Sequence, residues 1–183
     1  MEKLVITGGT TLTGEVSIMG AKNSAIAILP ATLLCKGICT LNNVPNIIDV
    51  NLSCQILEQL GSKITWVGPS LTIDNTNIYN THAPLDLTSK FRASYYLIGA
   101  MLSRCKEIEV GLPGGCNLGA RPIDQHIKAF EALGATANCS QGKINVSTNK
   151  LIGSNIYMDV VSVGATINAL LASVFAEGTT TID

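Results

Sequence analysis

The chain is poor in aromatic and in charged residues, and it contains no long apolar run. Aromatic side chains make up 4% of its 183 residues and charged side chains 14%. Twelve lysines and arginines stand against 13 aspartates and glutamates, so the basic excess of nucleic-acid-binding domains is absent. No uninterrupted apolar stretch approaches the ~18 residues that span a bilayer, and no apolar signal segment follows Met1. These absences argue against nucleic-acid binding, membrane insertion and secretion, and we expect a cytoplasmic protein.

The sequence also lacks the spacings typical of zinc sites and of disulfide scaffolds. It has two histidines, His82 and His126, and no Cys-x-x-Cys pair. Six cysteines lie at irregular spacings in a chain that is large for a disulfide scaffold, so we expect reduced thiols. Five of them lie in or beside apolar segments and are assigned to packing: Cys35, Cys39, Cys54, Cys105 and Cys139.

Cys116 differs, because it lies in a glycine-rich loop that leads to an arginine and a helix start. Residues 111–124 read GLPGGCNLGARPID. Glycines let the backbone approach a ligand closely, and Pro122 suits the first position of a helix. A thiol near a cation and a helix N-terminus is acidified and exposed, which favours a reactive cysteine beside an anion site. A small buried thiol is the alternative.

The chain repeats itself at a spacing of about seventy residues. Three Ala/Leu-rich helices begin near Asn23, Arg92 and Gly164, 69 and 72 residues apart, and each is followed by a β-branched strand. In the first two copies a helix with an i, i+4 apolar stripe and two strands follow, over residues 48–73 and 123–146. The unit is helix, strand, helix, strand, strand, and a third copy breaks off at Asp183. This self-similarity predicts a pseudo-symmetric α/β fold.

Residues 1–20 lie outside the repeat. Two β-branched segments, residues 4–6 and 16–18, predict short strands around Gly8, Gly9 and Gly14. Residues 75–84 form a polar connector between the first two copies. We therefore separate an N-terminal segment, 1–20, from a domain that covers 21–183.

Three cations stand at helix starts, where a positive charge is unfavourable by roughly 0.3–1 kcal/mol. They are Lys22, Arg92, which follows Thr88 as a possible N-cap, and Arg121. Their recurrence at equivalent positions predicts a bound anion, because helix N-termini and basic side chains both bind phosphates and carboxylates. Solvated surface residues are the alternative.

Neighbouring polar residues allow two interpretations each. Asn23 suits either a helix cap or a ligand contact, and Asp124 either favours its helix dipole or accepts a ligand hydroxyl. His126 reads as a helix-surface residue, although its spacing from Cys116 leaves a supporting role open. Pro30 predicts a kink in the first helix.

Four segments together resemble one family. They are residues 20–23, 91–94, 113–124 and 162–166. Their order and spacing resemble UDP-N-acetylglucosamine 1-carboxyvinyltransferase, the enolpyruvyl transferase of the first committed step of bacterial peptidoglycan synthesis. The match runs from about Lys3 to Asp183. The sister family that acts on shikimate 3-phosphate shares the fold but not the cysteine loop.

The resemblance implies an inside-out α/β barrel, or α-β prism, of repeated βαβαββ units with helices inside and sheets outside. The family has two domains of three units each, with the active site in the cleft between them. Residues 21–183 would form the first domain with an incomplete third unit. Residues 1–20 would pair with the second domain, which lies beyond this sequence and would supply a catalytic Asp and an Arg.

The resemblance also implies the reaction and the residues that perform it. The enolpyruvyl group of phosphoenolpyruvate moves to the 3-hydroxyl of UDP-N-acetylglucosamine, and phosphate is released. Lys22 and Asn23 would bind phosphoenolpyruvate, Arg92 and Arg121 anionic groups, and Cys116 would protonate the methylene carbon. The nucleotide would contact a larger set: Arg121, Pro122, Ile123, Asp124, Gln125, Ser162, Val163 and Gly164. No metal or organic cofactor is implied.

Two departures from the family pattern stand out. Val160 occupies a position where many relatives carry Lys, and Tyr96 one where some carry Trp. This chain alone is expected to be inactive without the second domain. The alternative is a non-catalytic truncated paralogue that binds UDP-sugar. A thiol redox protein lacks a resolving cysteine at useful spacing.

Overall fold

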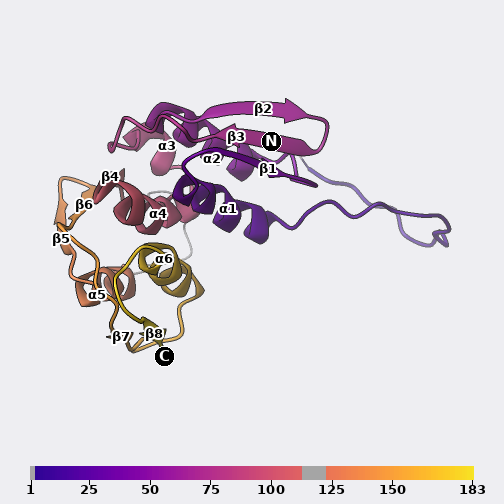
Figure 1. Ribbon diagram of the computed structural model, residues 1–183. Helices are drawn as coiled ribbons and strands as arrows, with labels where there is room; N and C mark the ends of the chain where they lie inside the picture. Colours follow the sequence, from indigo (N-terminus) through magenta and orange to yellow (C-terminus); the bar gives the residue numbers. More distant parts are fainter. Residues whose placement is uncertain (1–2, 113–122) are drawn as a thin grey trace.

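The computed structural model describes residues 3–112 and 123–183, with the helices gathered at the centre and small sheets around them (Figure 1). The first unit comprises α1 (Lys22–Ala31), a 3-10 turn η1 (Thr32–Leu34), β1 (Ile38–Leu41), α2 (Ile48–Leu60), β2 (Lys63–Val67) and β3 (Ser70–Asp74). The second comprises α3 (Leu85–Thr88), a 3-10 turn η2 (Arg92–Tyr95), α4 (Tyr96–Cys105), β4 (Glu107–Gly111), α5 (Asp124–Ala132), β5 (Thr136–Ser140) and β6 (Lys143–Ser147). The last elements are β7 (Asn155–Ile156), α6 (Val163–Ser173) and β8 (Thr181–Ile182).

The first two sheets have the same antiparallel topology. Their strand orders are β1-β3-β2 and β4-β6-β5, so the last strand of each unit lies in the middle. Ile73 pairs with Cys39 and Ile64, and Val146 with Ile108 and Ala137. β7 and β8 form a separate parallel pair. Within the described residues no sheet closes on itself.

Most predicted helices and strands are confirmed, but the apolar stripe on α2 is only half right. Ile56 and Leu60 are fully buried, whereas Ile48 is 77% exposed. A row of residues spaced by four drifts around a helix of 3.6 residues per turn, so its far end leaves the core face. Val50 and Leu57 complete that face. Gly61, in the left-handed conformation with φ 118°, ends α2 as predicted.

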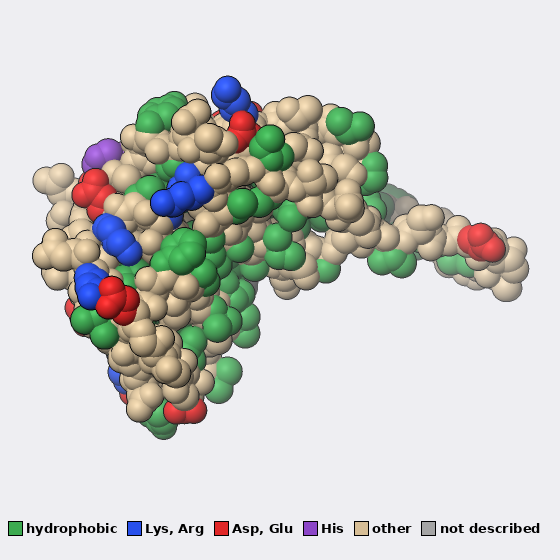
Figure 2. All heavy atoms as spheres, in the orientation of Figure 1, with side chains coloured by type: hydrophobic (Ala, Val, Ile, Leu, Met, Phe, Trp, Pro, Cys, Tyr) green, Lys and Arg blue, Asp and Glu red, His purple; other side chains and the backbone are tan. Residues whose placement is uncertain are grey.

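The N-terminal segment forms no strand in the structure, which corrects that prediction. Residues 3–20 project from the body as an extended arm (Figure 1). Leu4, Ile6 and Val16 are at least 75% exposed, and Figure 2 shows hydrophobic side chains along this arm. A strand needs a neighbour to receive its backbone hydrogen bonds, and the described residues offer the arm none.

Two smaller predictions also change, those for Thr88 and for the cysteines, while the kink at Pro30 stays a prediction. Thr88 is the last residue of α3 rather than an N-cap, and its hydroxyl donates to the Pro84 carbonyl at 3.0 Å. Pro30 lies one residue before the end of α1, where the chain tightens into the η1 turn. Cys35 and Cys139 are exposed, so the assignment of all five cysteines to packing is wrong for these two. In the described part of the chain, no helix is long and apolar enough to cross a membrane.

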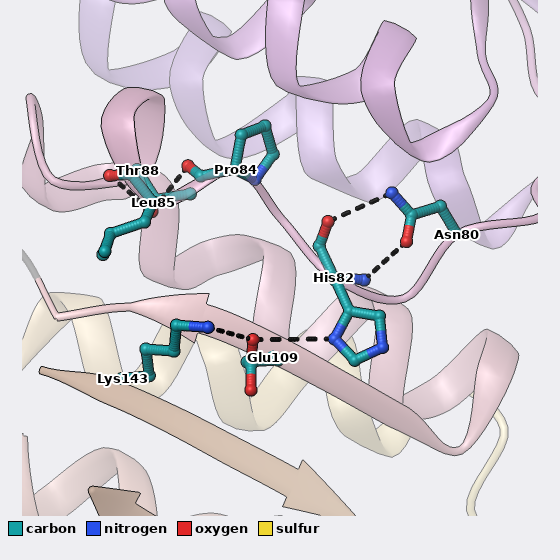
Figure 3. A network of polar contacts seen from close by, with 7 residues as sticks. All are labelled: Asn80, His82, Pro84, Leu85, Thr88, Glu109 and Lys143. Atoms are coloured by element: carbon teal, nitrogen blue, oxygen red, sulfur yellow. Dashed lines mark hydrogen bonds and ion pairs between the residues drawn. The ribbon is translucent and has the colours of Figure 1, made fainter. Parts of the chain in front are cut away.

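The polar connector over 75–84 is attached to the edge of β4 (Figure 3). The Asn80 amide donates to the His82 carbonyl at 3.1 Å and accepts the His82 N–H at 2.9 Å. His82 bridges to Glu109 in parallel, and its Nδ1 lies 3.6 Å from Glu109 Oε1. Lys143 donates to the same carboxylate at 2.8 Å, and this bond holds the pKa of Glu109 below its usual range. The connector therefore fixes the first unit against the second.

Arg104, on α4, ties three separate segments together. Its guanidinium donates to the carbonyls of Leu33 at 2.7 Å, Cys35 at 2.9 Å and Asn75 at 2.5 Å. We expect Arg104→Ala to lower the free energy of unfolding by about 2 kcal/mol, because these carbonyls lose a charged donor. Chemical denaturation measures this loss. Arg104→Lys, which lacks the planar fork, should recover only part of it, and full recovery would contradict this assignment.

Candidate functional site

A cavity of about 470 Å³ opens where the N-terminal turns of several helices meet. Its walls come from α1, α2, η2, α4, α5 and the beginning of α6: Lys22, Asn23, Ile26, Asp49, Arg92, Ala93, Tyr95, Tyr96, His126, Ser162 and Gly164. The structure thus brings together five residues predicted as site residues from distant parts of the sequence. The predicted residues Cys116, Arg121 and Pro122 lie outside the described residues.

Lys22 is the first residue of α1, and it is paired with an acid that the sequence reading missed. Its Nζ lies 2.5 Å from Asp49 Oδ2, in the first turn of α2. The Lys22 side chain is 55% exposed, so the ion pair leaves it accessible from the cavity. The sequence position of Asp49 indicates only an acid that stabilises the N-terminus of its own helix, and nothing in the sequence predicts its contact with Lys22.

Asn23 is not a helix cap. The N-cap of α1 is Ala21, and among the residues that the structure describes no side chain caps this terminus. Asn23 lies inside the first turn and lines the cavity. Of the two interpretations that the sequence allowed, a helix cap is excluded and a ligand contact stays a prediction. The described residues therefore place no capping side chain on the first amide N–H groups of α1.

Arg92 begins η2 and is half-buried beside two tyrosines. Ser94 anchors this turn, since its hydroxyl lies 2.9 Å from the carbonyls of both Thr88 and Phe91. Burial raises the pKa of Tyr95 to about 12 and also raises the pKa of Tyr96. Both phenols therefore stay uncharged at neutral pH, and they add polar groups without charge to the cavity wall.

His126 is buried, which corrects its prediction as a helix-surface residue. It is 4% exposed, its ring centroid lies 5.6 Å from that of Tyr95, and its Nδ1 lies 2.8 Å from Asn168 Nδ2. Burial, and then the charge of Arg92, lower the pKa of His126 to about 4. The spacing from His126 to Phe130 and Leu133 on the apolar face of α5 could have indicated this burial.

This lowered pKa predicts that stability falls as the pH drops below neutral. An unfolded histidine binds its proton near pH 6.5 whereas folded His126 resists it until about pH 4, so the unfolded state binds more protons between these values. From pH 7 to pH 5 we expect a loss of about 2 kcal/mol from this residue. Denaturant titrations at both pH values measure it. His126→Phe should flatten the profile, and an equally steep profile in that variant would exclude His126 as its source.

The other predicted nucleotide residues that the structure describes do not line this cavity: Ile123, Asp124, Gln125 and Val163. Ile123 is the N-cap residue of α5, and Asp124 is exposed at the start of that helix. The buried Gln125 accepts the Asp159 N–H at 3.0 Å and donates to the Asp159 carboxylate at 3.1 Å. Val163 is 71% exposed. Gln125 therefore holds the segment before α6 in place.

Ser162 and Gly164 shape the wall that α6 contributes. Ser162 caps the helix, since its Oγ accepts the Ala165 N–H at 3.3 Å. A Cβ on Gly164 would lie 3.3 Å from His126 Cε1 and 3.4 Å from Nε2, so glycine leaves room for the imidazole edge. Val160, where the family pattern has a lysine, is 61% exposed.

Comparisons with known proteins show the family and the fold of this chain. The family model described as EPSP synthase (3-phosphoshikimate 1-carboxyvinyltransferase) matches residues 6–183. A UDP-N-acetylglucosamine 1-carboxyvinyltransferase of Clostridium botulinum is 56% identical over the whole chain, and one of Clostridium acetobutylicum is 54% identical. The chain spans 44% of the length of each, less than half of these relatives.

Two solved structures show the same fold at low identity. The enolpyruvyl transferase NikO from Streptomyces tendae superposes with a TM-score of 0.81 at 22% identity, over 96% of this chain and 41% of its own. The EPSP synthase of Acinetobacter baumannii gives 0.71 at 18% identity, over 92% of this chain and 40% of its own. These likenesses show the fold, and the match of the family model over residues 6–183 shows that the chain belongs to the EPSP synthase (3-phosphoshikimate 1-carboxyvinyltransferase) family.

Proposed function

We propose that this chain supplies one wall of the active site of a UDP-N-acetylglucosamine 1-carboxyvinyltransferase. The reaction would transfer the enolpyruvyl group of phosphoenolpyruvate to the 3-hydroxyl of UDP-N-acetylglucosamine and release phosphate. The relatives carry this name and are more than twice as long, so a second domain would complete the site. The expected inside-out barrel with an incomplete third unit belongs to the same proposal.

The observation that supports it best is the convergence of cations and helix starts on one cavity. Lys22 at the start of α1 and Arg92 at the start of η2 line the same space as Ser162 and Gly164 at the start of α6. Helix N-termini and basic side chains both favour anions. Both substrates are anionic, one through a carboxylate and a phosphate and the other through a diphosphate.

The residue types fit the chemistry. Lys22 and Asn23 would hold phosphoenolpyruvate, and Arg92 and Arg121 the anionic groups of either substrate. Cys116 would protonate the methylene carbon while the sugar hydroxyl adds to the neighbouring carbon and gives up its proton to a base of the second domain. Phosphate then leaves the same carbon and a proton leaves the new methyl group, so that the double bond forms again and the enol ether results. Fixed cations lower the barrier by stabilising the charge that develops.

The nucleotide would lie along the starts of α5 and α6. The contacts we propose there are Arg121, Pro122, Ile123, Asp124, Gln125, Ser162, Val163 and Gly164. The Gln125–Asp159 hydrogen bonds would keep the two helix starts in register for this purpose. With Val160 in place of the family's lysine, the nucleotide would be held with one cation fewer.

The Gly164 wall gives a specific test of this placement. The φ of Gly164 lies outside the left-handed range, but its added Cβ would lie 3.3 Å from His126 Cε1 and the buried ring would have to shift slightly, so Gly164→Ala should lower the melting temperature by a few degrees without unfolding the protein. It should weaken UDP-N-acetylglucosamine about tenfold, because the methyl group narrows the cavity and displaces the ring. Calorimetric titration measures this change. Undiminished affinity would place the nucleotide elsewhere.

Steady-state assays of the chain joined to the second domain of a close relative test the function as a whole. We expect phosphate release that requires both phosphoenolpyruvate and UDP-N-acetylglucosamine, and that is lost in Cys116→Ala. Binding of the UDP-sugar without turnover in the joined protein would instead favour a non-catalytic paralogue.

A further inference from the structure

A buried chain of hydrogen bonds connects three helices behind the cavity. The backbone N–H of Gly99, on α4, donates to Asn168 Oδ1, on α6, at 2.9 Å. Asn168 Nδ2 in turn lies 2.8 Å from Nδ1 of His126, on α5. Asn168 is fully buried, and Ala165, Ala169 and Ala172 surround it along α6. A buried amide in such an alanine face costs free energy unless its hydrogen bonds are made.

The first link fixes which way the Asn168 amide points. A backbone N–H only donates, so the atom that it contacts must be the amide oxygen. The NH₂ group therefore faces His126, and because an amide nitrogen only donates, Nδ1 of the imidazole must accept. A neutral imidazole that accepts at Nδ1 carries its proton on Nε2.

We infer that Asn168 is a positioning residue that fixes His126 as the Nε2–H tautomer, so that His126 presents an uncharged hydrogen-bond donor to an anionic substrate oxygen. The identity of that substrate rests on the proposed function, but the tautomer does not. His126 lines the cavity together with Lys22 and Arg92, and its Nε2 edge faces the start of α6 at Gly164.

A neutral donor suits this position better than a cation. Arg92 already brings a positive charge that disfavours a second one on His126, and burial acts in the same direction. The neutral ring would give the site a hydrogen-bond donor with a fixed orientation and would add no further positive charge. The oxygen that it contacts would belong either to phosphoenolpyruvate or to the diphosphate of the UDP-sugar, and titration with each ligand distinguishes the two.

The test is a nitrogen-15 NMR measurement on the full chain labelled at histidine. At pH 7 we expect the His126 ring to show a protonated Nε2 and an unprotonated Nδ1. Asn168→Asp replaces the donor by a carboxylate, which accepts, so the proton should move to Nδ1 or the ring should become doubly protonated. The wild-type spectrum alone is decisive if this variant does not fold, because a protonated Nδ1 there would overturn the inference.

A matched control separates positioning from helix packing. Ser103 Oγ donates to the Ala172 carbonyl at 3.2 Å and also joins α4 to α6, but it does not touch His126. Ser103→Ala should therefore leave the tautomer unchanged. A tautomer that shifts equally in Ser103→Ala and Asn168→Asp would mean that Asn168 acts only through packing.

Ligand titrations complete the test. We expect phosphoenolpyruvate or UDP-N-acetylglucosamine, but not both, to shift the Nε2 resonance, and Asn168→Asp to weaken that ligand about tenfold. If both ligands bind and neither shifts the Nε2 resonance, the donor role is excluded. If neither ligand binds even when the second domain of a close relative is joined to the chain, the donor role and the proposed function both fail, while the substrate-free tautomer measurement still decides whether Asn168 orients the ring.

Discussion

Replacing Lys22 by alanine should lower turnover of the enzyme completed with its second domain by at least about 100-fold, the loss typical of one preorganised electrostatic contact. Lys22 is a point charge at the start of α1, at the wall of the cavity, and no other lysine among the described residues lines that cavity. Water that fills the space left by the lysine side chain would screen the charge that develops on the substrate, but unlike the ammonium group it would not be held in a fixed position. Steady-state phosphate release measures the loss.

Two controls make this result specific. Lys63→Ala removes an exposed lysine of β2 that lies away from the cavity, and it should leave the rate unchanged. Asp49→Asn removes the partner that holds Lys22 at 2.5 Å, and it should reduce the rate less than loss of the lysine itself. A normal rate in Lys22→Ala would remove Lys22 from the proposed site.

Gly99→Ala should destabilise the fold by about 3 kcal/mol, against the direction that helix propensity predicts. In an exposed helix the change from glycine to alanine stabilises by about 1 kcal/mol. Here a Cβ would lie 2.4 Å from the backbone oxygen of Asn168 and 2.9 Å from its Oδ1. α4 and α6 would have to separate, and the melting temperature should fall by roughly 6–12 °C.

The matched control is Gly37→Ala, where the nearest atom would be Cys35 Sγ at an ordinary 3.8 Å. Scanning calorimetry of both variants measures the difference. We expect the Gly37 variant to melt within a few degrees of the wild type. An unchanged melting temperature in Gly99→Ala would show that the close approach of α4 to α6 does not support the fold.

Periodicity and turn chemistry predict the elements of this chain well. Glycines at the ends of helices and closely spaced β-branched residues locate α2, β2, β3 and β6, because these signals act within a few residues of their own positions. The arm over 3–20 has the same alternation and forms no strand, since strand formation depends on a partner that no local pattern reveals.

The residues of the site also divide into those that the local sequence indicates and those that depend on contacts between distant segments. The cations Lys22 and Arg92 are visible in the sequence, because a positive charge at a helix start conflicts with the dipole. Asp49, the partner of Lys22, and Asn168, the partner of His126, are not visible, because each reads as an ordinary residue of its own helix until packing brings the two partners together. His126 is intermediate, since its spacing on the apolar face of α5 predicts burial but not its contact with Asn168.

The most direct test of the central proposal is phosphate release from phosphoenolpyruvate and UDP-N-acetylglucosamine, first with this chain alone and then with the second domain added. We predict no release from the chain alone, and release that needs both substrates once the second domain is present. No release from the completed protein, while Cys116 and Lys22 are intact and both ligands bind, would contradict the assignment of this cavity to enolpyruvyl transfer.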